Sequence, residues 1–143
     1  MKDYKKILLV VDLSEDSQVI GERARAIAAC YQSEITLLHV VEYVPVEPMG
    51  EALLPTVQIE SELVERARNR LTELANKLAL GQARQLVETG GIKTEIIRTA
   101  QRLGVDLIVL GSRERHGLAI LLNFTEDTIL HAAPCDVLAV RLH

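Results

Sequence analysis

Few side chains in this sequence could carry out catalysis, and they are scattered along the chain. Ser14 and Ser112 are potential nucleophiles, but no histidine and acid accompany either of them in a pattern that would activate a hydroxyl. The sequence contains neither the G-x-S-x-G motif of a nucleophile elbow nor the G-x-x-x-x-G-K-[ST] motif of a phosphate-binding loop. The sequence therefore predicts that the protein is not an enzyme.

The histidines and cysteines do not have the spacing of metal ligands. The four histidines lack acidic partners at ligand spacing, and the two cysteines form no C-x-x-C pair. We expect Cys30 and Cys135 to be small buried hydrophobic side chains. His39 lies among apolar residues, which is typical of a histidine whose hydrogen bonds are satisfied within a strand. No metal site is predicted.

Apolar runs alternate with helical repeats along the chain. The predicted strands are Ile7–Val11, Ile35–Val41, Gln85–Glu88, Asp106–Gly111 and Asp136–Leu142, and the predicted helices run from the N-cap Ser14 to Tyr31 and over Val57–Leu80, Thr94–Leu103 and Leu118–Ala132. Strands joined by helices pair in parallel through right-handed crossovers. We therefore predict an α/β fold with one open, doubly wound sheet of five parallel strands, in the order 3-2-1-4-5, and helices on both faces.

In this strand order the chain changes its winding direction between the first and fourth strands. Ligands of such sheets bind in the crevice at the C-terminal ends of the two strands. Here the crevice is lined by Val10 to Ser14 and by Gly111 to His116. Asp12 can cap the helix that follows, contact a ligand, or do both.

A long loop is predicted to leave the second strand beside the crevice. Residues Glu42 to Thr56 contain three prolines and one glycine, and loops of this length in compact domains are usually functional or mobile. We expect this loop to be mobile and to cover the site. The short polar segment from Ser112 to His116 is predicted to be a second loop.

Length and charge narrow the classes of protein further. The chain has 143 residues, which suits one domain, and its net charge of −4 comes without any basic run that could follow a phosphate backbone. No apolar stretch approaches the roughly 20 residues that span a bilayer, and the first apolar run is too short for a signal peptide. We therefore expect a cytoplasmic protein that binds neither nucleic acid nor membrane.

Four blocks of the sequence resemble the universal stress protein family along nearly the whole chain. They are Tyr4-Lys-Lys-Ile-Leu-Leu-Val-Val-Asp-Leu-Ser14, Leu38-His-Val-Val-Glu42, Gly104-Val-Asp-Leu-Ile-Val-Leu-Gly-Ser112 and Ala133-Pro-Cys-Asp-Val-Leu-Ala-Val140. Their order and spacing make the match specific. The resemblance implies that residues 1–143 form one universal stress protein domain, with the fold of the adenine nucleotide α-hydrolases.

The resemblance also implies where AMP or ATP would bind in a member with an intact site. Asp12 matches an acid suited to a ribose hydroxyl, Val40 matches a backbone position that contacts the adenine edge, and Gly111 matches the first glycine of a phosphate-binding pattern. The candidate nucleotide-binding residues are Val10, Asp12, Val40, Gly111, Ser112, Arg113, Asn123 and Thr125.

Other residues depart from the family's glycine pattern. Glu114 occupies the second glycine position and brings a negative charge to the phosphate side, which Arg113 could offset only in part. Asn123-Phe124 occupies a Gly-Ser position, and a register one residue later would place Phe124-Thr125 there. We therefore expect a non-catalytic stress-response module with a degenerate nucleotide site and no cofactor. The alternative is an AMP- or ATP-binding regulatory protein, with slow ATPase activity conceivable.

The last predicted strand lies at a sheet edge and is rich in aliphatic residues. Val137 and Ala139 should face one side of the sheet, and Leu138 and Val140 the other. Such an edge invites pairing with another chain. The sequence, together with the family resemblance, predicts a homodimer in which these strands pair antiparallel about a two-fold axis. A second universal stress protein or a regulatory target protein is a further expected partner.

Overall fold

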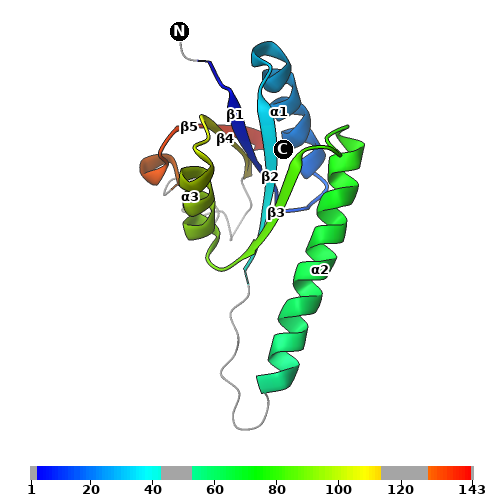
Figure 1. Ribbon diagram of the computed structural model, residues 1–143. Coiled ribbons are helices and arrows are strands. Elements are labelled where there is room, and N and C mark those ends of the chain that lie inside the picture. The colour runs from blue at the N-terminus through cyan, green and yellow to red at the C-terminus, as the bar shows by residue number, and fades with distance from the viewer. Residues whose placement is uncertain (1–2, 43–52, 114–128, 143) are drawn as a thin grey trace.

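Five parallel strands form one sheet in the order β3-β2-β1-β4-β5, which confirms the predicted α/β fold (Figure 1). The computed structural model describes residues 3–42, 53–113 and 129–142. The strands are β1 (Lys6–Val10), β2 (Glu34–Val41), β3 (Arg84–Thr89), β4 (Leu107–Arg113) and β5 (Asp136–Leu142), and the helices are α1 (Ser17–Tyr31), α2 (Leu53–Lys77) and α3 (Ile92–Leu103). Residues 129–132 are also helical.

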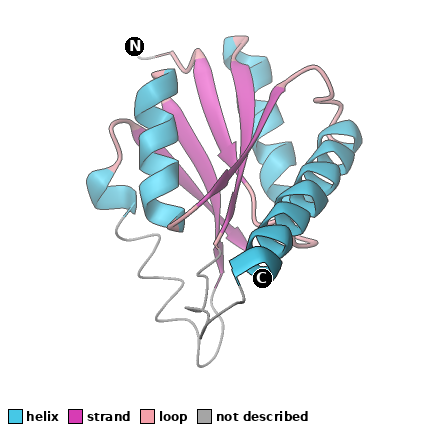
Figure 2. Ribbon diagram, turned by 60° about the horizontal axis from the view of Figure 1, so that its bottom comes forward, coloured by secondary structure: helices cyan, strands magenta, loops and turns pink. Residues whose placement is uncertain are grey.

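Helices cover both faces of the sheet and bury the central strand. α1 and α2 lie on one face and α3 lies on the other (Figure 2). In β1, Ile7 and Leu9 pack toward α1 and α2, whereas Leu8 packs toward α3, and all three side chains are fully buried. A strand buried on both faces gives the residues that follow it a rigid base.

The start of α1 differs from the prediction. α1 begins at Ser17, its N-cap is Asp16, and no side chain caps its first turn, so the prediction that Ser14 is the N-cap is wrong. The reason is a turn before the helix, in which the backbone N–H of Ser14 bonds to the side chain of Asp12. Cys30 is exposed, so its predicted burial is also wrong, because it lies off the buried stripe of α1.

α2 and β4 extend into segments that were predicted to be loops. α2 begins at Leu53 because Pro55 falls in its first turn, where no intrahelical N–H bond is lost, and it ends at Lys77, shortly before the left-handed Ala79. β4 continues through Ser112 and Arg113, which pair with β5. Most of the predicted loop after β2, and residues 118–128 of the predicted fourth helix, lie outside the described residues.

Candidate functional site

The C-terminal ends of β1 and β4 lie side by side, as the crevice prediction requires. The two strands pair from Ile7 with Leu107 to Leu9 with Val109. Asp12 comes shortly after β1, and Gly111 lies two residues beyond Val109 in β4. The topology thus brings both candidate residues to the same edge of the sheet, with the half-buried Val10 beneath them on the α3 face.

Asp12 closes the turn that leads into α1. Its Oδ1 atom accepts a hydrogen bond from the backbone N–H of Ser14 at 2.9 Å and another from Oγ of Ser17 at 3.1 Å. Partial burial of the carboxyl raises its pKa, but the hydrogen bonds from Ser14 and Ser17 lower it by more, so the pKa of Asp12 lies below the ordinary value for aspartate. Asp12 therefore closes the turn that precedes α1, whereas the predicted capping bond from its carboxylate to the helix is absent among the described residues.

Two side chains from distant parts of the sequence hold the backbone of the same turn. Nδ1 of His39, in β2, lies 2.8 Å from the carbonyl oxygen of Val11, so His39 is satisfied within the sheet as predicted. The guanidinium of Arg70, in α2, donates a hydrogen bond to the carbonyl of Leu13. Leu13 is buried and has a φ of +64°, a left-handed conformation that is uncommon for a residue other than glycine.

Val40 presents its backbone to the crevice. The carbonyl of Leu38 points toward β1, because it accepts the N–H of Val11 at 3.0 Å, and Val40 points the same way because it is two residues further along the strand. The pairing of β1 with β2 ends at Val10 and Leu38. Within the described part of the chain, the N–H and C=O of Val40 therefore face the crevice beyond the end of β1, where a planar donor–acceptor edge could bind.

Gly111 has a packing role that the sequence did not reveal. A methyl group at this position would lie 2.6 Å from Cδ1 of Ile20 in α1 and 2.8 Å from Cδ1 of Leu142 in β5. Both distances are shorter than a carbon–carbon contact allows. A side chain at Gly111 would therefore require the ends of the Ile20 and Leu142 side chains to shift.

Of the remaining predicted site residues, the structure describes only some. Ser112 and Arg113 lie in β4, where they pair with Arg141 and Leu142, rather than in the predicted polar loop. The candidate residues Asn123 and Thr125, and the pattern-breaking residues Glu114 and Phe124, lie outside the described residues.

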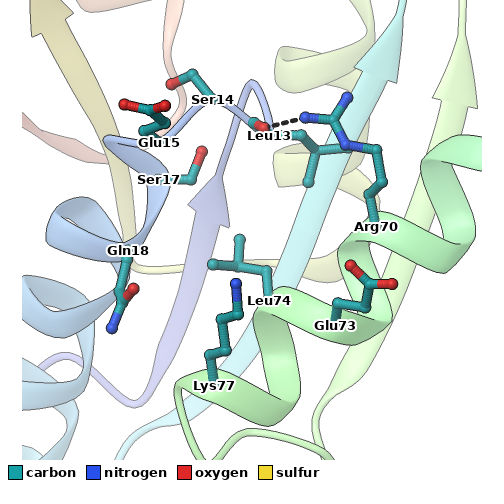
Figure 3. A pocket seen from close by; sticks show the side chains of 9 residues that line it. All are labelled: Leu13, Ser14, Glu15, Ser17, Gln18, Arg70, Glu73, Leu74 and Lys77. Atoms are coloured by element: carbon teal, nitrogen blue, oxygen red, sulfur yellow. Dashed lines mark hydrogen bonds between the residues drawn. The ribbon is translucent and has the colours of Figure 1, made fainter.

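A cavity of about 490 Å³ lies behind the turn, between the start of α1 and α2 (Figure 3). Its lining residues on the α1 side are Leu13, Ser14, Glu15, Ser17 and Gln18, and on α2 they are Arg70, Glu73, Leu74 and Lys77. We did not predict the contribution of α2 from the sequence. The available signal was the spacing of Arg70, Glu73 and Lys77, three and four residues apart, which places polar side chains on one face of a helix.

The described residues provide neither a metal cluster nor a membrane-spanning helix. Within residues 3–42, 53–113 and 129–142, no group of three or more histidine, cysteine or acidic side chains is arranged to hold a metal ion. In the same ranges, no helix combines the length and apolar character needed to cross a membrane.

Comparison with known proteins agrees with this architecture. The model of the universal stress protein family matches residues 3–141. Universal stress protein A homolog 1 of Coxiella burnetii is 41% identical over 138 residues, which cover 96% of each chain. The structure of universal stress protein UspA from Lactobacillus plantarum is 27% identical, has a TM-score of 0.75, and is matched over 99% of this chain and 100% of that one. A universal stress protein in complex with cAMP has a TM-score of 0.64 at 16% identity, over 97% and 98% of the two chains.

The fold and the crevice define a doubly wound α/β protein with its candidate site at the switch point of the sheet. The match of one family model to almost the whole chain, together with a relative at 41% identity, identifies the family. The chain belongs to the universal stress protein family.

Proposed function

We propose that this protein is a non-catalytic regulatory module of the stress response whose adenine-nucleotide site is degenerate. The observation that carries the proposal is that two residues matching the family pattern have structural roles. Asp12 closes the turn before α1, and Gly111 makes room for Ile20. Neither of these roles requires a bound nucleotide. In the sequence, Glu114 and Phe124 stand where phosphate binding favours a glycine and a small hydroxyl residue.

An AMP- or ATP-binding regulatory protein, with slow ATPase activity, is the second candidate. The position of Val40 favours it, because the backbone N–H and C=O of this residue face the crevice beyond the last pairing with β1. The edge of an adenine ring offers a donor and an acceptor that such a pair can bind. The family relative in complex with cAMP also supports an adenine ligand in this fold.

A direct test separates the two candidates. Protein purified without added nucleotide should show no excess absorbance at 260 nm, and the assay is sensitive because the chain has three tyrosines, one phenylalanine and no tryptophan. Titration calorimetry with ATP, AMP and cAMP should then show weak binding or none. Micromolar binding of any of the three would favour the second candidate, and release of inorganic phosphate from ATP would add the slow ATPase.

We further propose that the module acts in the cytoplasm as a homodimer formed through β5, with another universal stress protein or a regulatory target as a further partner. β5 is the last strand of the sheet order and, among the strands that the structure describes, pairs only with β4. Leu138 and Val140 pack toward α1 and α2, whereas the side chain of Ala139 is exposed. The backbone edge and the face that includes Ala139 are therefore the surfaces on which a second copy would pair.

A further inference from the structure

The peptide unit between Leu13 and Ser14 is held from both sides. Its carbonyl oxygen accepts a hydrogen bond from Arg70, and its N–H donates to Oδ1 of Asp12 at 2.9 Å. The C=O and N–H of a trans peptide point in opposite directions, so a side chain on each side fixes one rigid plane. Figure 3 shows the guanidinium of Arg70 reaching from α2 to the carbonyl of Leu13.

The conformation of this turn depends on its surroundings. Leu13 has a φ of +64°, and a leucine stays in the left-handed region only where neighbouring groups over-determine it. The buried side chain of Leu13 anchors the turn in the core beneath α1 and α2. On the strand side, His39 holds the carbonyl of Val11, and on the helix side Arg70 holds the carbonyl of Leu13.

We propose that Arg70 is a positioning residue for Asp12, acting through the peptide between Leu13 and Ser14. The guanidinium fixes the peptide plane, and the N–H of that plane fixes one oxygen of the carboxylate at the end of β1. Loss of the guanidinium frees the peptide to rotate and releases the carboxylate from Ser14. The orientation of the candidate site residue is thereby linked to Arg70 in α2, which lies 57 residues from Leu13 along the chain. This link does not depend on whether a nucleotide binds.

Arginine suits this task better than the other residues that the position could carry. Its charge is permanent, and its planar group keeps several donors in a fixed arrangement, so one N–H can hold a carbonyl while the others stay solvated. Arg66 and Arg68 are exposed on the same helix and have no hydrogen bond to the turn among the described contacts. Arg66 therefore provides a matched control for removing an arginine from α2.

The test compares Arg70→Ala, Arg70→Gln and Arg70→Lys with Arg66→Ala, all without nucleotide. Two quantities are measured by nuclear magnetic resonance: the exchange rate of the Ser14 amide and the pKa of the Asp12 carboxyl. In Arg70→Ala we expect Ser14 to exchange at least tenfold faster, and the pKa of Asp12 to rise toward its ordinary value. Arg70→Lys keeps a charged donor on a flexible stem. Its Ser14 exchange rate and Asp12 pKa should therefore lie between those of the unmodified protein and those of Arg70→Ala.

Measurements of global stability separate a positioning role of Arg70 from a general loss of stability. Unfolding by urea gives the stability of each variant, and amides in β1 report global opening. A merely structural role would speed exchange in β1 and at Ser14 alike and would leave the pKa of Asp12 in the folded protein unchanged. That result, or values for Arg70→Ala equal to those for Arg66→Ala, would overturn the proposal. If Arg70→Ala does not fold, Arg70→Gln decides, because it keeps a neutral N–H donor on a shorter side chain and should give intermediate shifts.

Discussion

The Cβ position of Gly111 lies 2.6 Å from Cδ1 of Ile20, so a side chain at this point of β4 would displace the end of the Ile20 side chain on α1. In the sequence, the same glycine is the first member of a phosphate-binding pattern. The structure gives it a second explanation that requires no ligand. A glycine that matches a binding motif is therefore weak support for binding until its packing has been examined.

Replacing Gly111 with alanine should destabilise the fold. The added methyl group would displace the terminal carbons of Ile20 and Leu142. Because these are the flexible ends of their side chains, we expect a loss of about 1 kcal/mol of unfolding free energy, at the low end for overpacking. Gly91→Ala is the control, because a methyl group there meets Thr94 at 3.6 Å, an ordinary contact. Urea unfolding of the two variants makes the comparison. Equal stability of Gly111→Ala and Gly91→Ala would show that packing does not require the glycine in β4.

A second glycine, Gly21 in α1, faces the side chain of Leu78, which directly follows α2. A methyl group on Gly21 would lie 2.3 Å from Cδ1 of Leu78, although alanine favours a helix over glycine by about 1 kcal/mol. We expect the clash to outweigh this propensity, so that Gly21→Ala lowers the unfolding free energy. Leu78→Ala removes the clashing atoms, so the loss from Gly21→Ala should vanish or reverse in that background. A double-mutant cycle followed by urea unfolding measures this coupling, and additive effects would contradict it.

The sheet could be predicted from the sequence because its signals are local. Runs such as Ile7–Val11 are aliphatic throughout, as expected of strands buried on both faces, and their alternation with helices predicts a parallel, doubly wound sheet. The ends of elements were harder to place. Ser14 has the composition of an N-cap, yet the turn closed by Asp12 moves the start of α1 to Ser17.

The candidate site could be predicted only where it depends on topology. The edge that carries Asp12, Val40 and Gly111 follows from the strand order, so the sequence located it. The hydrogen bond from Arg70 to Leu13 could not be predicted, because it depends on how far α2 runs past the end of β1. The packing role of Gly111 was missed for the same reason, since it requires the distance between α1 and β4.

The carboxylate of Asp12 should make stability depend on pH. Its pKa is lower in the folded protein than the ordinary value of about 3.9, so its contribution is present above that value and is lost as the pH falls through the lower folded pKa. Asp12→Asn should therefore be less stable than the unmodified protein near pH 7, and the difference should shrink below pH 4. Urea unfolding from pH 2.5 to 7 tests this, with the exposed Glu62→Gln as control. A difference that stays constant over this range would exclude a role for the carboxylate charge.

Restoring the family's glycine pattern should restore phosphate binding if the site is degenerate. The variant Glu114→Gly, Asn123→Gly, Phe124→Ser removes a negative charge and two side chains from the phosphate side. We expect its affinity for ATP to be at least tenfold higher than that of the unmodified protein in titration calorimetry. AMP has a single phosphate and should gain less. Unchanged ATP affinity in a folded triple variant would mean that these three residues do not account for the degenerate site.

The proposed dimer predicts that a single charge at the middle of β5 separates the two copies. β5 spans Asp136–Leu142, so Ala139 is its central residue, and antiparallel pairing about a two-fold axis would place the two copies of Ala139 close to each other. Ala139 is exposed, so Ala139→Glu sets two like charges across the axis without entering the core. Leu138 and Val140 are unsuitable for this test, because both pack toward α1 and α2 and a charge there would destabilise the monomer.

Sedimentation equilibrium at micromolar concentration distinguishes the outcomes. The unmodified protein and the control Ala29→Glu, an exposed position on α1, should both show twice the monomer mass of 15.8 kDa. Ala139→Glu should show the monomer mass and an unchanged circular dichroism spectrum, because only the edge between copies is altered. A mass near 15.8 kDa for the unmodified protein would exclude the dimer. A dimer that survives Ala139→Glu would place the interface away from the centre of β5, because two glutamates on the axis could not face each other without loss of affinity.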